Sequence, residues 1–469
     1  MATERYQASS YEITGDKSNG TQPHAHDVEV GDRRLSHVDV ARITRVSSVI
    51  TVLVAGLALF SDGYNAQIIG YMEPLFTDLY KDGMSSIIKT RLSNAYLIGK
   101  IFGMLFFGFL IDRIGRRTGI VFATFFLILG IVLATAAHGT TELGMFWMMI
   151  IARGVAGFGA GGEYPTCGTG SAEASDESEY VRRRRGFLVA VATDFAIDFG
   201  FVVAGVVALV VIECYNEKIS SGIWRICFGL GFVLPVTLFF FRIRMVESSQ
   251  YRKHAIKQNI PYWLIIKRYW KPMVGTSLAW FMYDFVTYPF GIFSSTIIGQ
   301  LNPNNTLIQN IGYGFILGGA LNPIQSVFPL FVVLYGVFNS LGEMGPGVCT
   351  FLTAAESFPT PLRGHFMGFA AAVGKAGAAI GTQVFTPIQD SFGDTQKGTQ
   401  AVFLIGAGFA AAGGIISWIF IPDRDRELES EDAKFREYLA AHGYEGDFGE
   451  SLIAEVKTTA FKPDYTKTS

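Results

Sequence analysis

The stretch GVAGFGAGGEYPTCGTGSAE, residues 154–173, decides how this chain folds. Its many glycines and alanines would let neighbouring helices approach closely, which is how helices associate inside a lipid bilayer. Glu163, in the middle of the stretch, would be costly at membrane depth unless it faced a cavity lined by protein. The stretch therefore predicts a membrane-spanning helix that carries a functional carboxylate, with the rest of the chain arranged around a cavity.

The composition favours an all-α polytopic membrane protein. Of the 469 residues, 50% are hydrophobic and only 17% are charged, and the chain contains 40 Phe and 53 Gly. The net charge of −2 provides no basic surface for nucleic acid. The four cysteines lack paired metal-ligand spacing, and no catalytic nucleophile or phosphate-binding loop stands out. We therefore expect no metal, no cofactor and no enzymatic activity.

Apolar segments recur along the whole chain. A bilayer core about 30 Å thick needs roughly 20 apolar residues per helix. By this criterion we expect about ten membrane spans. They are residues 47–70, 95–111, 119–137, 145–169, 186–212, 224–241, 272–298, 326–352, 364–388 and 400–421.

Lysines and arginines in the short loops predict the orientation of the spans. Basic loops at 112–117, 182–185 and 242–271 all fall on one side, which should be cytoplasmic. Both termini would lie on that side, and the loop 71–94 would lie outside. The sequon at Asn304 also falls outside, where it would be glycosylated. We expect a multi-pass protein of the plasma membrane.

The spans divide into two similar halves. The segment GEYPTC at 162–167 has a loose echo, GEMGPGVC, at 342–349. Six spans precede the central loop but only four follow it, which indicates that two spans are missing. The expected segments are a disordered cytoplasmic tail at 1–45, an N-terminal six-helix bundle at 46–242, a cytoplasmic linker at 243–271, an incomplete C-terminal bundle at 272–422 and a cytoplasmic tail at 423–469.

Several segments resemble the major facilitator superfamily. GFLIDRIGRR at 108–117 resembles its loop signature between helices two and three, and RGVAGFGAG at 153–161 resembles its fourth-helix signature. GGEYP at 161–165, WFMYDFVTY at 280–288 and ESFPTPLRG at 356–364 look more specifically like the phosphate:proton symporter family. The sequences of these motifs are most similar to those of the fungal glycerophosphoinositol permease branch. The resemblance implies a major facilitator fold.

Members of that family have twelve spans, so the resemblance implies that this chain lacks helix eight and most of helix nine. The apolar part of 311–321 covers only about a dozen residues, too few to cross a bilayer, and it resembles the tail of helix nine. Losing one span in each direction preserves the topology downstream. A skipped exon or gene-model error and a genuinely shortened protein remain equally open explanations.

The resemblance implies a set of proton-coupling residues. It places Glu163 and Asp284 in the middle of helices four and seven, facing each other across the halves as a coupling pair. Asp62 in the first span is expected to line the polar cavity and to join them in coupling, and Arg153 belongs to the coupling and packing network. The alternative for each acid is a structural carboxyl paired with a neighbour. Lys100 is expected to extend towards the membrane interface.

An anionic substrate needs cationic donors. Lys375 is our candidate for phosphate contact, since lysine serves as a point charge for phosphate. Trp280, Asp284 and Tyr288 recur at four-residue spacing on one helix face, although aromatic residues at that spacing are also typical of packing. Asp194 shares a face with Asp198, and its role stays open. The expected substrate-binding residues are Tyr164, Trp280, Tyr288, Lys375 and Asp198.

The loop signature supplies a candidate gate. Its charged residues are Asp112, Arg113, Arg116 and Arg117. In a gate, the aspartate would pair with a helix end or an arginine and hold one conformation. As an alternative, the loop would serve only as a basic anchor on the cytoplasmic side. Both roles are compatible.

Three functional hypotheses follow. The first is a secondary active transporter, a proton-coupled symporter of a small anionic metabolite that contains phosphate, such as a glycerophosphodiester or inorganic phosphate. The second is a repurposed permease for an unrelated metabolite. The third is a non-transporting receptor or an inactive truncated form. The expected partners are the anionic substrate, protons and the lipid bilayer, and the protein is expected to be a monomer.

Overall fold

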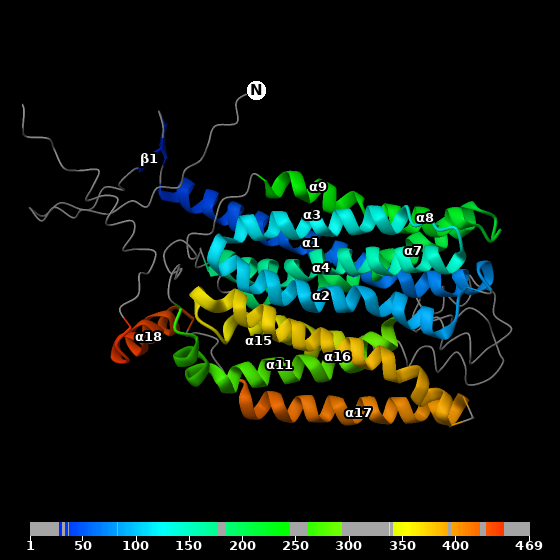
Figure 1. The fold of residues 1–469 in the computed structure, drawn as a ribbon. Helices are drawn as coiled ribbons and strands as arrows, with labels where there is room; N and C mark the ends of the chain where they lie inside the picture. The colour runs from blue at the N-terminus through cyan, green and yellow to red at the C-terminus, as the bar shows by residue number, and fades with distance from the viewer. Residues whose placement is uncertain are drawn as a thin grey trace, which may run out of the picture.

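Helices dominate the structure, a computed structural model in which two halves pack side by side (Figure 1). The description covers residues 28–30, 33–35, 37–81, 83–176, 184–243, 260–292, 337, 341–392, 395–422 and 428–444. Two short strands, β1 (Val28–Val30) and β2 (Arg33–Leu35), pair antiparallel with Val28 opposite Leu35. The prediction of a disordered tail over 1–45 is therefore wrong for these strands and for the start of the first helix.

The N-terminal half contains two expected spans that are each split into two helices. One break falls at Thr193, and the other falls at residues 231–232. Ser85 and Ser220 cap helix starts by accepting backbone N–H groups, which satisfies donors that have no partner in the first turn. The helices are α1 (His37–Leu79), α2 (Ser86–Ile114), α3 (Arg116–Thr135), α4 (Glu142–Asp176), α6 (Arg185–Ala192), α7 (Asp194–Cys214), α8 (Ser221–Leu230) and α9 (Val233–Arg242).

In the C-terminal half a stretch of π-helix, η1 (Glu343–Gly347), leads directly into an α-helix. Single-turn π segments inside helices are rare and are frequent at functional sites. The other elements are α11 (Tyr262–Ile292), α15 (Val348–Glu356), the 3₁₀ turn η2 (Thr360–Leu362), α16 (Arg363–Ser391), α17 (Thr395–Phe420) and α18 (Leu428–Ala441). In Figure 1, α11, α15, α16 and α17 lie together beside the N-terminal half, and α18 lies at one end.

The described helices confirm a multi-pass membrane architecture. They form seven stretches that are long and apolar enough to cross a membrane, two of which combine α6 with α7 and α8 with α9. Two further helices, α11 and α16, have 31 and 29 residues and correspond to the expected spans 272–298 and 364–388. The large apolar side chains on the outside of the bundle, such as Phe102 (64% exposed) and Trp418 (88% exposed), suit contact with lipid. The expected helix-nine remnant 311–321 and Asn304 lie outside the described residues.

Several expected boundaries are wrong. The loop predicted over 71–94 is mostly helical, because α1 continues to Leu79 and α2 begins at Ser86. The linker predicted over 243–271 is shorter, because α11 begins at Tyr262. In these stretches the helices extend beyond the apolar spans into polar sequence, which a criterion based on apolar length does not detect.

The predicted C-terminal tail contains a packed helix. On α18, Phe435 and Leu439 are buried against α11 and residues around Phe358. Asp432 accepts hydrogen bonds from the backbone and hydroxyl of Thr360, at 2.8 and 2.7 Å. Residues 428–444 therefore form part of the folded unit.

Glycines bring helices into direct backbone contact. At Gly157 of α4, a Cβ atom would lie 2.1 Å from the carbonyl oxygen of Tyr96 on α2. The two halves meet in the same way at Gly368 of α16, where a Cβ atom would lie 2.5 Å from the Met104 carbonyl oxygen. A third contact joins Gly70 of α1 to Ile292 of α11, near the other end of the bundle. We call the end of the bundle where Asp112 lies the Asp112 end, and the end where Gly70 lies the Gly70 end.

Substituting Gly157 by alanine tests this packing. We expect Gly157→Ala to force α2 and α4 apart and to lower the free energy of unfolding by about 1–3 kcal/mol, the usual cost of overpacking. The melting temperature of the detergent-purified protein measures the loss. Gly408→Ala is the matched control, because a Cβ atom at Gly408 would meet nothing within 4 Å. Equal melting temperatures for the two variants would contradict the close contact.

Candidate functional site

Asp62 of α1 is the centre of a buried polar cluster in the N-terminal half. Lys100 of α2 forms an ion pair with it at 2.7 Å, and both side chains are fully buried. Tyr96 and Tyr164 each donate a hydroxyl hydrogen bond to Asp62 at 2.9 Å. The expectation that Lys100 extends to the membrane interface is therefore wrong, because its ammonium group finds a carboxylate inside the bundle.

A second ion pair lies in the C-terminal half. Lys375 of α16 donates to Asp284 of α11 at 2.8 Å, and both side chains are almost fully buried. The Lys375 ammonium group also lies 4.0 Å from the centre of the Tyr288 ring. It lies 5.3 Å from the centre of the Tyr164 ring, and the Lys100 ammonium group lies 5.1 Å from that same centre. One tyrosine ring thus connects the two ion pairs.

Aromatic side chains line the contact between the halves. Tyr164 stacks on Phe351 at 5.3 Å between ring centres, and Trp280 lies 4.8 Å from Phe351. Trp280 also contacts Tyr164, at 6.5 Å between centres, and is 1% exposed. Two of the expected substrate residues, Tyr164 and Tyr288, therefore lie beside the lysines, and a third, Trp280, packs against Tyr164.

Glu163 belongs to a separate cluster within the N-terminal half. Its partner is Arg242 of α9, at 2.5 Å, and both side chains are buried. Thr124 of α3 donates to the same carboxylate at 3.4 Å. Glu163 therefore does not face Asp284 as a pair, because each acid has a basic partner in its own half. Arg242, which we expected in a cytoplasmic loop, lies at the end of α9 and is the basic partner of Glu163.

Arg153 connects helices through backbone carbonyls. It donates to Leu92 of α2 at 3.0 Å and to Asn65 of α1 at 3.4 Å. Its guanidinium group also lies 5.3 Å from the centre of the Tyr96 ring. This geometry fixes α1, α2 and α4 relative to one another and links Arg153 to the Asp62 cluster through Tyr96.

Asp112 of the expected gate reaches across to the C-terminal half. Its Oδ2 atom accepts the backbone N–H of His365 at 2.8 Å and lies 2.5 Å from the His365 Nδ1 atom. His365 lies in the first turn of α16, where unpaired N–H groups and the helix dipole favour a carboxylate. The aspartate thus meets a helix end, which is one of the two pairings expected for a gate.

The other gate residues have different surroundings. Arg113 donates to the Tyr262 hydroxyl at 3.3 Å, and the same hydroxyl lies 3.2 Å from the His365 Nε2 atom. Arg117 donates to the carbonyl of Ile243 in the N-terminal half. The side chain of Arg116 lies outside the described part. Asp112 and Arg113 therefore both contribute to the contact with α11 and α16.

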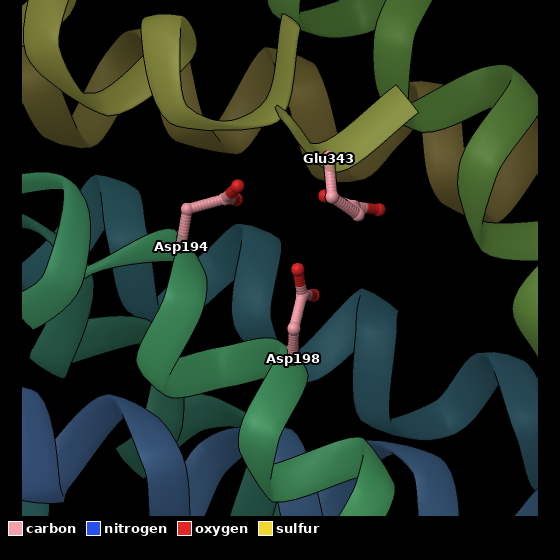
Figure 2. A group of neighbouring side chains, drawn as sticks. All are labelled: Asp194, Asp198 and Glu343. Atoms are coloured by element: carbon pink, nitrogen blue, oxygen red, sulfur yellow. The ribbon is translucent and has the colours of Figure 1, made fainter. Parts of the chain in front are cut away.

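A further group of acids lies where α7 faces η1. Asp194 and Asp198 project from α7, and Glu343 projects towards them from η1 (Figure 2). One carboxylate oxygen of each lies within 4.8 Å of the others. Asp198 was expected in the substrate site, and the role of Asp194 was left open. In the sequence, Glu343 was notable only because the segment 342–349 resembles the segment 162–167, which contains Glu163.

The arrangement of two helical halves around buried charges is the architecture of major facilitator transporters. The fold superposes on the proton:xylose symporter XylE with a TM-score of 0.66 and 17% identity, covering 83% of this chain and 99% of XylE. At this identity the likeness concerns the fold alone. A profile of the sugar (and other) transporter family matches residues 51–259 and 307–431, and the chain belongs to that family.

Curated relatives extend over most of the chain. Glycerophosphoinositol permease 1 of Candida albicans is 39% identical, over 86% of this chain and 84% of the relative. Glycerophosphoinositol transporter 1 of Saccharomyces cerevisiae is 34% identical, over 89% and 88%. A probable inorganic phosphate transporter of rice is 24% identical, over 74% and 85%. These matches confirm the resemblance to the fungal glycerophosphoinositol permeases, and the protein is a membrane transporter.

The buried pair between Glu163 and Arg242 yields a stability prediction. Arg242→Met would leave Glu163 without its basic partner, which costs about 3–5 kcal/mol in a buried pair. We expect a large fall in melting temperature from Arg242→Met alone. The double variant Glu163→Gln/Arg242→Met should recover much of it, because no buried charge remains. A double variant no more stable than Arg242→Met would refute the pairing.

Proposed function

We propose that this transporter moves a small phosphate-bearing anion together with protons. The observation that carries the proposal is that the ammonium groups of Lys100 and Lys375, one from each half, lie over the ring of Tyr164. Two lysines that converge on one place suit an anion with several oxygen atoms. The names of the curated relatives support a phosphodiester or inorganic phosphate as that anion.

Exchange of partners would couple the anion to protons. In the described structure the lysines are neutralised by Asp62 and Asp284. A phosphate that binds between the lysines would compete with these carboxylates. A carboxylate that loses its cation in a buried site is costly as an ion, so it would take up a proton. Asp62 and Asp284 are thus the proposed proton carriers, and Trp280 and Tyr288 would enclose the substrate.

Glu163 and Arg153 have supporting roles in this proposal. Protonation of Glu163 would break its ion pair with Arg242 and free α4 to move relative to α9. Arg153 would keep α1 and α2 in register during that movement through its two carbonyl contacts. Asp198 would contact a different part of the substrate.

The proposed orientation puts the Asp112 end in the cytoplasm of a plasma-membrane protein. Basic residues of the described part gather at that end, including Arg113, Arg117 and Arg268, which agrees with the tendency of cytoplasmic loops to be positive. Both termini would then be cytoplasmic. One chain supplies both lysine clusters, which supports a monomer as the working unit.

Uptake measurements test the transport proposal. Cells that lack their own organophosphate permeases and express this chain should accumulate labelled glycerophosphoinositol, faster in acidic medium and less after a protonophore. We expect Lys375→Gln to reduce uptake about tenfold or more, since it removes a charged contact to phosphate. Lys397→Gln, at an exposed lysine of α17, is the matched control. Well-folded surface protein without uptake would instead favour a receptor.

The contact between Asp112 and His365 predicts a state-dependent gate. Asp112→Asn removes the carboxylate that the first turn of α16 binds, so the Asp112 end should open more often. Labelling of Met367→Cys, which replaces a fully buried side chain of α16, reports opening when the native cysteines are absent. We expect labelling at least about fivefold faster, the low end of typical coupling between states. Unchanged labelling would leave Asp112 as a topology anchor only.

A further inference from the structure

Three acids converge on one point inside the bundle. Asp194 and Asp198 lie one turn apart on α7, and Glu343 begins the π-helix that faces them (Figure 2). One carboxylate oxygen from each acid lies within 4.8 Å of the other two. Tyr283 of α11 donates its hydroxyl hydrogen to Glu343. Elements of both halves therefore contribute to this cluster, which we call the acidic triad (Asp194, Asp198 and Glu343).

The triad contains an acceptor without a donor. Asp194 is 6% exposed, and its Oδ2 atom has no hydrogen-bond partner in the described part of the chain. A Cβ atom on Gly347 would lie 2.5 Å from that oxygen and 2.5 Å from the Glu343 Oε2 atom. Glycine therefore lets the π-helix approach these oxygens closely. An unpaired buried acceptor points to a donor that comes from outside the chain.

Charge balance points to a cationic donor. Three other buried acids have basic partners, namely Lys100 for Asp62, Arg242 for Glu163 and Lys375 for Asp284. Within the described residues no lysine, arginine or histidine forms an ion pair with the triad. The sequence from 293 to 340, which leads into η1, contains none of these residue types. Three carboxylates at membrane depth without a cation are costly, so a cationic ligand would stabilise them.

The triad adjoins the proposed phosphate site. Tyr283, the donor to Glu343, directly precedes Asp284, the partner of Lys375. The positive charge of Lys375 interacts electrostatically with all three acids of the triad. A zwitterion would supply an anion for Lys375 and a cation for the triad.

We propose that the acidic triad binds the primary ammonium group of a zwitterionic phosphodiester whose phosphate lies at Lys375. A primary ammonium group has three N–H donors, and the triad offers three carboxylates to accept them. This inference rests on the proposed function, because it assigns the second end of the same substrate. It makes Asp198 a residue that selects the head group, separate from the phosphate contact.

Binding to the purified full-length protein tests the proposal. The probes are glycerophosphoethanolamine, glycerophosphocholine and glycerophosphoinositol, which share the phosphodiester and differ in the head group. We expect the ethanolamine ester to bind about tenfold more tightly than the inositol ester, which corresponds to about 1.4 kcal/mol. The choline ester, which has no N–H donors, should fall between them. Calorimetry in detergent measures the three dissociation constants, with and without EDTA.

Variants of the triad should remove this preference. Asp198→Asn and Glu343→Gln should each bring the ratio of ethanolamine to inositol affinity close to one, whereas Lys375→Gln should weaken all three esters alike. Gly347→Ala is a second test, because its methyl group would displace the Asp194 and Glu343 oxygens without changing charge, and it should lower the same ratio. Melting temperatures verify that each variant is folded.

Three results would overturn the proposal. Equal affinity for the ethanolamine and inositol esters would refute ammonium binding but leave phosphate binding standing. A preference that disappears with EDTA would assign the triad to a metal ion. If no ester binds to the folded wild-type protein, the proposed function fails as well, so the two failures are distinguishable.

Discussion

The need to neutralise buried charge determines how this protein is built. A charge inside a bilayer is costly unless it has a partner of opposite sign, good geometry and further hydrogen bonds. Asp62 illustrates the solution, with one ammonium group and two tyrosine hydroxyls directed at its two oxygens. The same requirement explains Lys375 with Asp284 and Arg242 with Glu163. Because each partner comes from a different helix, neutralising the charges also fixes the helix arrangement.

Close helix packing makes that neutralisation possible. Side chains as short as aspartate reach a partner only where the helices nearly touch, and glycine permits this. Gly157 against Tyr96 and Gly368 against Met104 are such contacts within and between the halves. The second contact lies between α2 and α16, the same two helices that carry Lys100 and Lys375. Movement of one half against the other would therefore act directly on the charged site.

The pairs differ in what they can do. Glu163 and Arg242 both belong to the N-terminal half, so movement of the halves does not by itself separate them. Asp112 and His365 belong to different halves, so in the proposed gate their bond would break when the Asp112 end opens. The acidic triad likewise draws on both halves, but it has no cation of its own in the described part. Its charge would be balanced only when a ligand is present, which suits a site that must bind and release.

The sequence alone determined the membrane class, the approximate spans and the family, because apolar length and local motifs depend on neighbours in the chain. It also indicated Asp62, Glu163, Asp284 and Lys375, since charged residues within apolar spans are conspicuous. Only the tertiary structure decided the partners. Lys100 and Arg242 lie near the ends of predicted spans, where a basic residue usually meets water or lipid head groups. Glu343 was notable in the sequence only as part of the segment that repeats residues 162–167. Pairing depends on which helices touch, and residues 79 or more positions apart, such as Glu163 and Arg242, meet only through packing.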